Sequence, residues 1–174
     1  MARLDELGPS DAAEALLPCC ASRRWVTQVA GGRPYGSLPR LVDGSHAALA
    51  GLEWTDIEQA LAAHPRIGDR GRPAPQAGPV PQAGPADREA SWSAQEQRGT
   101  ATLGTAERDE LRAANAAYEQ LFGYVFLICA TGKSAGQLLA ALRERLGHDA
   151  GTEREVIRAE LREIVALRLA KAFR

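Results

Sequence analysis

The sequence is 174 residues long, which is enough for one domain with a hydrophobic core and short for two. Its 21 lysine and arginine residues nearly balance its 22 aspartate and glutamate residues, so the formal charge is -1 and offers no basic footprint for nucleic acid or an anionic membrane. We therefore expect a single domain over residues 1–174 whose partner is a small molecule or another protein.

The sequence shows no membrane-spanning or targeting segment. A spanning helix needs roughly 20 apolar residues, whereas the longest apolar run is YVFLICA at 124–130. The first residues, MARLDELGPS, lack a basic region followed by an apolar stretch, and the last residues, KAFR, form no recognisable sorting signal. We predict a soluble, cytoplasmic protein.

The metal-ligating residue types are scattered. Cys19 and Cys20 are adjacent, Cys129 is far from both, and the three histidines have no companions at metal-ligand spacing. We expect reduced, mostly buried cysteines and no metal site. The stretch Gly132-Lys133-Ser134 lacks the earlier glycine of a phosphate loop, because Leu127 stands at that position.

The composition favours an all-α fold. Aromatic residues make up 5% of the chain, and period-two alternation of β-branched residues is nearly absent. We predict a bundle of about seven to nine helices. Four pairs fit the capping box, in which Ser or Thr is followed three residues later by Glu or Gln: Thr55 with Glu58, Ser93 with Glu96, Ser134 with Gln137, and Thr152 with Glu155.

The first helix assigned in this way runs from Thr55 to His64 and is stopped by Pro65, which leaves His64 close to the apolar stripe. A Pro/Gly-rich loop is expected around residues 69–90, where the sequence PQAGP occurs twice. This segment cannot bury enough apolar surface to offset its ordering entropy, so we expect a mobile surface loop. The alternative is a flap over a neighbouring pocket.

Three further helices follow. One covers about residues 105–122, carries Leu111, Asn115, Tyr118 and Phe122 on one side, and stops at Gly123. The next runs from Ser134 to Gly147. The last covers residues 153 to about 173, and its apolar stripe of Ile157, Leu161 and Ile164 also contains Arg168.

Each polar candidate also has an ordinary explanation. His64 could simply hydrogen-bond a carbonyl group in the core, and Ser93 with Glu96 could only cap a helix. Arg168 must either extend its guanidinium to water or meet an anion, because it stays charged. If that anion is not a protein carboxylate, it should be a ligand carboxylate.

Taken in order, four motifs closely resemble the OHCU decarboxylase family: His64-Pro65-Arg-Ile-Gly68, Ser93-x-x-Glu96-Gln97, Phe122-Gly123-x-x-Phe126-Leu-Ile-Cys129-Ala130, and Leu167-Arg168-Leu169. The resemblance spans nearly the whole chain. It implies an all-α fold, commonly a homodimer, that converts 2-oxo-4-hydroxy-4-carboxy-5-ureidoimidazoline to (S)-allantoin in the last step of urate degradation.

By the same resemblance, His64 would be the catalytic proton donor, with Glu96 beside it to keep the imidazole protonated and oriented, and Arg168 would grip an anionic or carbonyl group. The substrate-binding positions implied are Pro65, Ser93, Ala94, Gln95, Gln97, Phe126, Leu127, Ile128, Cys129 and Ala130. The substrate supplies its own electron sink in its C=N unit, so we expect no cofactor. The chain shows no transthyretin-like hydrolase segment, so another protein is expected to supply the preceding hydrolysis.

Three alternatives stay open at this level. The chain could be a helical interaction module without catalysis, a decarboxylase of another carboxylated heterocycle, or a hydrolase of an amide or ureido bond. The enzyme hypothesis requires that His64, Glu96, Gln97 and Arg168, which lie far apart in the sequence, converge on one pocket.

Overall fold

The computed structural model describes residues 2–68, 84–97 and 104–173. Within these ranges the chain forms nine helices and no strand, which confirms the predicted all-α class for the part of the chain described. The helices are α1 (Ala2–Asp5), α2 (Pro9–Leu16), α3 (Arg23–Gly31), α4 (Leu38–Ala50), α5 (Trp54–Ala62), α6 (Pro85–Glu96), α7 (Thr105–Phe122), α8 (Ala135–Arg145) and α9 (Ala150–Ala172).

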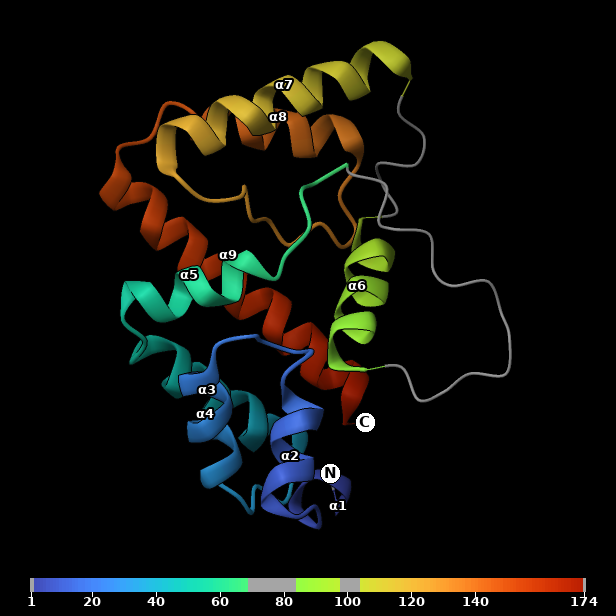
Figure 1. The fold of residues 1–174 in the computed structure, drawn as a ribbon, viewed down its shortest axis with the longest axis vertical. Coiled ribbons are helices and arrows are strands. Elements are labelled where there is room, and N and C mark those ends of the chain that lie inside the picture. Colours follow the sequence, from blue (N-terminus) through green and yellow to red (C-terminus); the bar gives the residue numbers. More distant parts are fainter. Residues whose placement is uncertain (1, 69–83, 98–103, 174) are drawn as a thin grey trace.

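The long helix α9 runs obliquely through the middle of the molecule (Figure 1). Helices α1 to α4 gather at one end, where α2 packs on α3, α3 on α4, and α4 on α9. At the other end α7 packs on α8. Helix α6 stands beside the C-terminal half of α9, so the site described below lies between these two helices and the end of α5.

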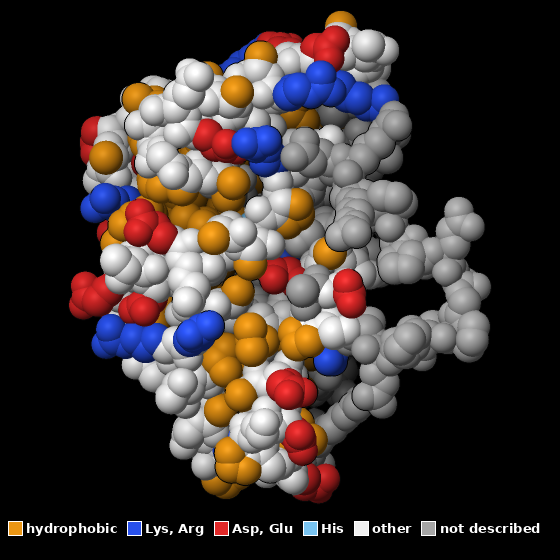
Figure 2. Space-filling model, in the orientation of Figure 1, with side chains coloured by type: hydrophobic (Ala, Val, Ile, Leu, Met, Phe, Trp, Pro, Cys, Tyr) orange, Lys and Arg blue, Asp and Glu red, His pale blue; other side chains and the backbone are white. Residues whose placement is uncertain are grey.

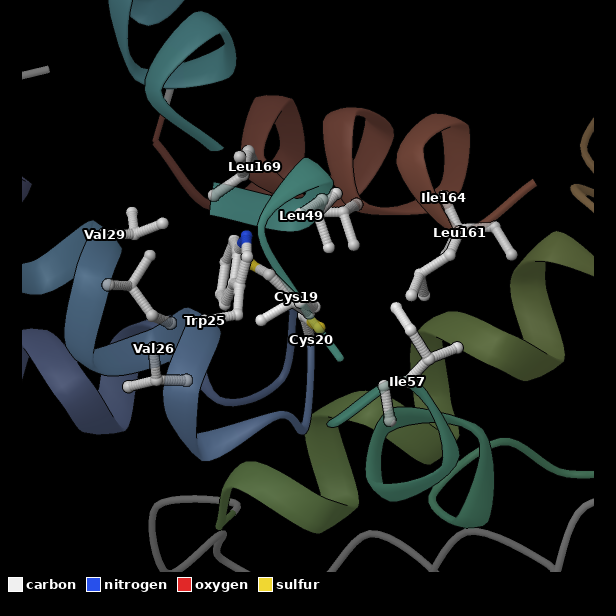
Figure 3. Packing of buried hydrophobic residues seen from close by; sticks show 14 of the residues in the cluster. Cys19, Cys20, Trp25, Val26, Val29, Leu49, Ile57, Leu161, Ile164 and Leu169 are labelled. Atoms are coloured by element: carbon white, nitrogen blue, oxygen red, sulfur yellow. The ribbon is translucent and has the colours of Figure 1, made fainter. Parts of the chain in front are cut away.

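The larger hydrophobic core is built around α9. Trp25, Val26 and Val29 of α3 meet Leu49 of α4, Ile57 of α5 and the α9 side chains of Leu161, Ile164 and Leu169 (Figure 3). Cys19 and Cys20, in the turn after α2, are fully buried in the same cluster, and all three cysteines are free thiols. They therefore act as small apolar residues, as predicted.

The apolar run at 124–130 separates two hydrophobic clusters. Phe126, Ile128 and Ala130 belong to a second cluster with α7 and α8, whereas Leu127 belongs to the core around α9. This alternation is that of an extended chain whose successive side chains point to opposite sides. Because both sides are covered, the run is apolar throughout without being a membrane segment, and we call residues 124–130 the wall segment.

The predicted end of α7 and the predicted start of α8 are confirmed, whereas the predicted starts of α5, α6 and α9 are wrong. Helix α7 ends at Gly123, whose φ of 82° is in the left-handed region that glycine favours, and Ser134 caps α8 in a box with Gln137. Helix α5 instead begins after Glu53, whose N–H donates to Asp56 at 3.1 Å.

The start of α9 is also earlier than predicted. Asp149 caps it by accepting from the N–H groups of Gly151 and Thr152 at 2.8 and 3.0 Å. A carboxylate three residues before Thr152 reaches the same orphan donors, so the boxes proposed at Thr55 and Thr152 are wrong.

Helix α6 overturns part of the predicted loop at 69–90. It begins at Pro85, and the Gly84 N–H donates to the Asp87 carboxylate at 3.3 Å. Proline is compatible with the first position of a helix, because its missing N–H would be unpaired there anyway. Ser93 and Glu96 consequently lie near the end of α6 and cap no helix start. Residues 69–83 lie outside the described residues, so their mobility stays a prediction.

In the described part of the chain, no helix combines the length and apolarity needed to cross a bilayer. On the face shown in Figure 2, acidic and basic side chains are interspersed with hydrophobic ones, and neither sign of charge dominates.

Candidate functional site

The His64 imidazole is fixed at the end of α5. Its backbone N–H donates to the Leu61 carbonyl at 2.9 Å, and its Nδ1 lies 2.9 Å from the Ala60 carbonyl oxygen. Because a carbonyl oxygen only accepts, the hydrogen bond assigns the proton to Nδ1 and leaves the lone pair on Nε2. Nε2 is buried and has no hydrogen-bond partner among the described residues.

The turn that follows His64 is tied to α7. The Arg66 guanidinium makes a bidentate pair with Glu119 at 2.6 and 2.7 Å. The Asn115 amide donates to the Ile67 carbonyl at 3.0 Å. These contacts tie residues 66 and 67 to α7, so the turn that follows His64 does not depend on α5 alone.

A small cavity of about 20 Å³ opens beside His64, with room for a water molecule. Residues from α6, α9, the wall segment and the turn after α5 share its lining: His64, Pro65, Ile67, Ser93, Glu96, Gln97, Phe126, Leu127, Ile128, Ala130 and Ile164. Three of the four residues that the enzyme hypothesis requires at one pocket, His64, Glu96 and Gln97, thus line this cavity. The fourth, Arg168, does not line it but contacts the lining residues Ser93 and Glu96.

Arg168 is fully buried on α9, and its five N–H groups have five acceptors in the protein. Nε and Nη2 donate to the two carboxylate oxygens of Glu96 at 3.3 and 3.1 Å, and Nη2 also donates to Ser93 Oγ at 2.9 Å. Nη1 donates to the Pro18 carbonyl and to Glu89 Oε1, each at 3.3 Å. The alternative in which Arg168 extends to water is therefore wrong, and its anions are protein carboxylates.

The sequence analysis did not identify Glu89. This buried residue lies on α6, and its Oε1 is 3.9 Å from His64 Nδ1. Glu89, Ser93 and Glu96 occupy positions i, i+4 and i+7 of one helix, so they share the face that meets Arg168. That spacing was available in the sequence, but it indicates a common face only once residues 85–96 are assigned to a helix.

Burial dominates the proton equilibria of the site. It lowers the pKa of His64 to about 4, with a further contribution from the charge of Arg168, so the imidazole is neutral at pH 7. Burial also raises the pKa of Glu89 to about 7, against the opposing pull of Arg168. The carboxylate within 4 Å of His64 is that of Glu89. The expectation that Glu96 keeps the imidazole protonated is therefore wrong.

Four of the predicted positions lie apart from the cavity lining: Arg168, which reaches it only through Ser93 and Glu96, and Ala94, Gln95 and Cys129. Ala94 and Gln95 are exposed, because they lie on the opposite side of α6 from Ser93 and Glu96. Cys129 is half-buried; its N–H donates to Glu160 at 2.7 Å and its carbonyl accepts from Lys133 at 2.9 Å. Gln97, by contrast, lines the cavity and accepts from the Gly68 N–H at 3.0 Å.

A buried ionic network supports the wall segment from behind. Arg145 Nη1 donates to the Leu127 carbonyl at 2.7 Å, and its guanidinium carbon lies 4.5 Å from the centre of the Phe126 ring. Arg145 Nε donates to Glu153 at 2.8 Å, and the Tyr118 hydroxyl donates to the same carboxylate. Side chains thereby replace the sheet hydrogen bonds that an extended segment would otherwise make.

Among the described residues, no three His, Cys, Asp or Glu side chains are grouped so that they could hold a metal ion.

Comparison with known proteins identifies the family. The family model described as OHCU decarboxylase matches residues 5–170. The chain is 29% identical over 155 residues to the "Uric acid degradation bifunctional protein TTL" of Arabidopsis thaliana, covering 89% of this chain and 45% of that protein.

Several similar proteins are named 2-oxo-4-hydroxy-4-carboxy-5-ureidoimidazoline decarboxylase. That of Amia calva is 35% identical over 75 residues, 43% of each chain. That of Haloferax volcanii is 25% identical over 150 residues, 86% of this chain and 81% of the relative. The chain thus aligns with less than half the length of the Arabidopsis and Amia proteins and with most of the Haloferax protein.

Among solved structures, "Crystal structure of OHCU decarboxylase in the presence of (S)-allantoin" superposes with a TM-score of 0.73 at 26% identity, covering 92% of this chain and 97% of that one. An "(S)-allantoin synthase" superposes with a TM-score of 0.67 at 16% identity, covering 98% of this chain and 52% of that one, a likeness of fold alone. Since the family model matches nearly the whole length described, the chain belongs to the OHCU decarboxylase family.

Proposed function

We propose that this protein decarboxylates 2-oxo-4-hydroxy-4-carboxy-5-ureidoimidazoline to (S)-allantoin in urate degradation. The observation that carries the proposal is the buried Nε2 of His64, which has no hydrogen-bond partner among the described residues and lies at a cavity that Ser93, Glu96 and Gln97 also line, in a chain of this family. The similarity to a structure titled as OHCU decarboxylase with (S)-allantoin supports the same assignment.

The proposed chemistry balances with the substrate's own groups. The bond between ring carbon C4 and its carboxylate breaks, CO₂ leaves, and the electron pair moves through C5 to the nitrogen of the C=N unit, which takes a proton from solvent. The resulting enol loses its C4 hydroxyl proton and gains a proton at C5. One proton is taken up for each CO₂ released, and no external electron sink is needed.

His64 serves both halves of the enol step in this proposal. Its neutral Nε2 accepts the C4 hydroxyl proton, and the imidazolium so formed donates that proton to one face of C5. The proton-donor role expected from the sequence is thus retained, but it follows proton uptake, because the resting imidazole is neutral. Delivery by one fixed group to one face is what makes the product a single enantiomer.

Glu96 and Arg168 supply the electrostatics. Glu96 lines the cavity, but its carboxylate is paired with Arg168 and Lys171 in the resting site. A substrate carboxylate that replaces the contact of Glu96 with Arg168 lies beside a carboxylate of the same charge, and departure as neutral CO₂ relieves that repulsion. All the N–H groups of Arg168 are in use, so a substrate anion reaches it only by replacing Ser93 or Glu96. A cavity of about 20 Å³ is smaller than a substituted five-membered ring, so binding displaces lining side chains.

The remaining contacts proposed for the substrate come from the lining residues Pro65 and Gln97 and from the wall residues Phe126, Leu127, Ile128 and Ala130. Ala94 and Gln95 are not part of this proposal, since both are exposed. We keep Cys129 as a neighbour whose backbone is held by Glu160 and Lys133.

The test is to generate the substrate from urate with urate oxidase and the hydrolase, and to follow its ultraviolet decay and the circular dichroism of the allantoin. We expect faster decay that yields one enantiomer, and His64→Gln should lower the rate by about 10²- to 10⁴-fold, the usual range for a proton-transfer group. His46→Gln, on α4 and outside the cavity lining, is the matched control. Racemic product formed at the spontaneous rate would overturn the proposal and favour an interaction module.

We also propose that residues 1–174 act as one domain, as a homodimer in the cytoplasm, without cofactor or metal. Two large hydrophobic side chains, Leu121 and Leu167, are exposed in the described part of the chain and could be covered by a second copy. Three free thiols suit a reducing compartment. Light scattering coupled to gel filtration tests the dimer; a monomer at micromolar concentration would refute it.

A further inference from the structure

Glu89 lies behind the catalytic imidazole instead of in the cavity lining. Its Oε1 is 3.9 Å from His64 Nδ1 and 3.3 Å from Arg168 Nη1. The side chain is buried on the face of α6 that also carries Ser93 and Glu96. One carboxylate oxygen therefore bridges the proton-transfer group and the buried cation.

The charges around Glu89 explain what this bridge does. Arg168, on α9, is a fixed positive charge that disfavours a second positive charge on His64. Glu96, on α6, is engaged with Arg168 and with Lys171. Cys19 and Cys20, in the turn after α2, face the same region, but burial raises the pKa of each thiol to about 12, so both are neutral.

We propose that Glu89 is a positioning residue of the decarboxylation: its ionised carboxylate, next to His64 Nδ1, stabilises the imidazolium that forms when Nε2 accepts the substrate's hydroxyl proton. Glu89 makes and breaks no bond with the substrate and acts only through His64. This inference rests on the proposed function, and it adds a residue outside the motifs that the family resemblance supplied.

The role of Glu89 predicts how the decarboxylation rate changes with pH. His64 is already neutral well below pH 7, so the group that must ionise near neutrality is Glu89, whose pKa burial raises to about 7. Activity should therefore rise with pH through about 7 and level off above it. Protonated Glu89 leaves the imidazolium facing Arg168 without compensation.

The decisive variant is Glu89→Gln, which keeps the size of the side chain and removes its charge. Because a full charge next to the imidazole is lost, we expect kcat at pH 8 to fall about 10- to 100-fold with KM within about threefold. The rising limb near pH 7 should disappear. Glu89→Asp retains a carboxylate and should restore both the limb and part of kcat.

Glu163→Gln, an exposed carboxylate on α9, is the matched control and should behave as the unsubstituted protein. Substrate is prepared enzymatically, freed of the coupling enzymes by ultrafiltration and diluted into buffers from pH 5.5 to 8.5. Thermal unfolding of each variant shows whether a changed pH profile of activity comes from a loss of fold or from the loss of the Glu89 charge.

Two results would overturn the inference. If Glu89→Gln retains the rising limb, the limb belongs to another group. If Glu89→Asp behaves as Glu89→Gln, shape and not charge is what α6 supplies. The His64→Gln variant distinguishes failure of this inference from failure of the proposed function. If His64→Gln loses most of its activity and Glu89→Gln loses none, the role of Glu89 is refuted and the proposed function stands. If His64→Gln keeps its activity, the proposed mechanism itself is refuted.

Discussion

The sharpest test of the fold is Arg145→Met, which removes a buried guanidinium while nearly keeping its length. The variant leaves the fully buried Glu153 carboxylate with His148 at 2.8 Å and the Tyr118 hydroxyl, and without its arginine. It also leaves the Leu127 carbonyl without the donor now 2.7 Å away.

The magnitude follows from these two losses. Removing one partner of a buried ion pair costs about 3–5 kcal/mol, because the other charge stays in the interior. A buried carbonyl that loses its donor adds about 1–3 kcal/mol. We expect Arg145→Met to lower the free energy of unfolding by about 4–8 kcal/mol, a large share of the usual 5–15 kcal/mol.

The double variant Arg145→Met/Glu153→Gln separates the two contributions. It removes the stranded charge, so it should recover most of the loss and leave about 1–3 kcal/mol for the Leu127 carbonyl. Urea unfolding followed by far-ultraviolet circular dichroism measures both. A double variant that is no more stable than Arg145→Met would refute the reasoning, because the cost would then come from packing against Phe126 and not from an unpaired carboxylate.

Two further predictions concern stability. Gly68→Ala should lower the free energy of unfolding in urea by about 1–2 kcal/mol, because Gly68 has a φ of 83° and an added Cβ would lie 2.6 Å from Leu111 Cδ2. Gly136→Ala is the control: Gly136 lies inside α8, an added Cβ would meet nothing within 4 Å, and the variant should be as stable as the unsubstituted protein or more stable. Equal effects of the two substitutions would contradict this account. The pH dependence of unfolding should show two opposed slopes, each at most about 1.4 kcal/mol per pH unit. The pKa of His64 is 6.5 in the unfolded chain and about 4 in the folded protein, so between these pH values the unfolded chain binds more protons and stability rises with pH. The pKa of Glu89 is 4.5 in the unfolded chain and about 7 in the folded protein, so between these pH values the folded protein binds more protons and stability falls with pH. Glu89→Gln should therefore steepen the rise of stability between pH 5 and 6.5 and His64→Gln should reverse it, whereas unchanged slopes in both variants would exclude the shifted pKa values.

Local signals were enough where the stabilising contacts are themselves local. The box of Ser134 with Gln137 and the left-handed Gly123 lie within a few residues of the helix ends they set, so α7 and the start of α8 could be predicted correctly. The apolar stripe around Arg168 was equally readable, and the structure buries that stripe.

Prediction failed where a local signal had two meanings. The proline at 85 was interpreted as part of a loop, although it stands at the first position of α6. Because the first two turns of that helix were not predicted, Glu89, whose carboxylate lies 3.9 Å from His64 Nδ1, was not identified as part of the site. Local patterns could not identify the partners of Arg168, because Glu96 and Glu89 lie 72 and 79 positions away in the sequence. The family resemblance placed Glu96 near Arg168 but gave no indication of Glu89.

The contact between Arg168 and the Pro18 carbonyl has a consequence for how the protein folds. It joins positions 150 residues apart, so closing it brings together almost the whole chain. Contacts of such sequence separation form late, because the entropy of loop closure must be met before they contribute. During refolding, the circular dichroism signal of the helices should therefore appear before decarboxylase activity. A partly folded form in which the first helices are not yet packed should lack the contact that orients the Arg168 guanidinium toward α6.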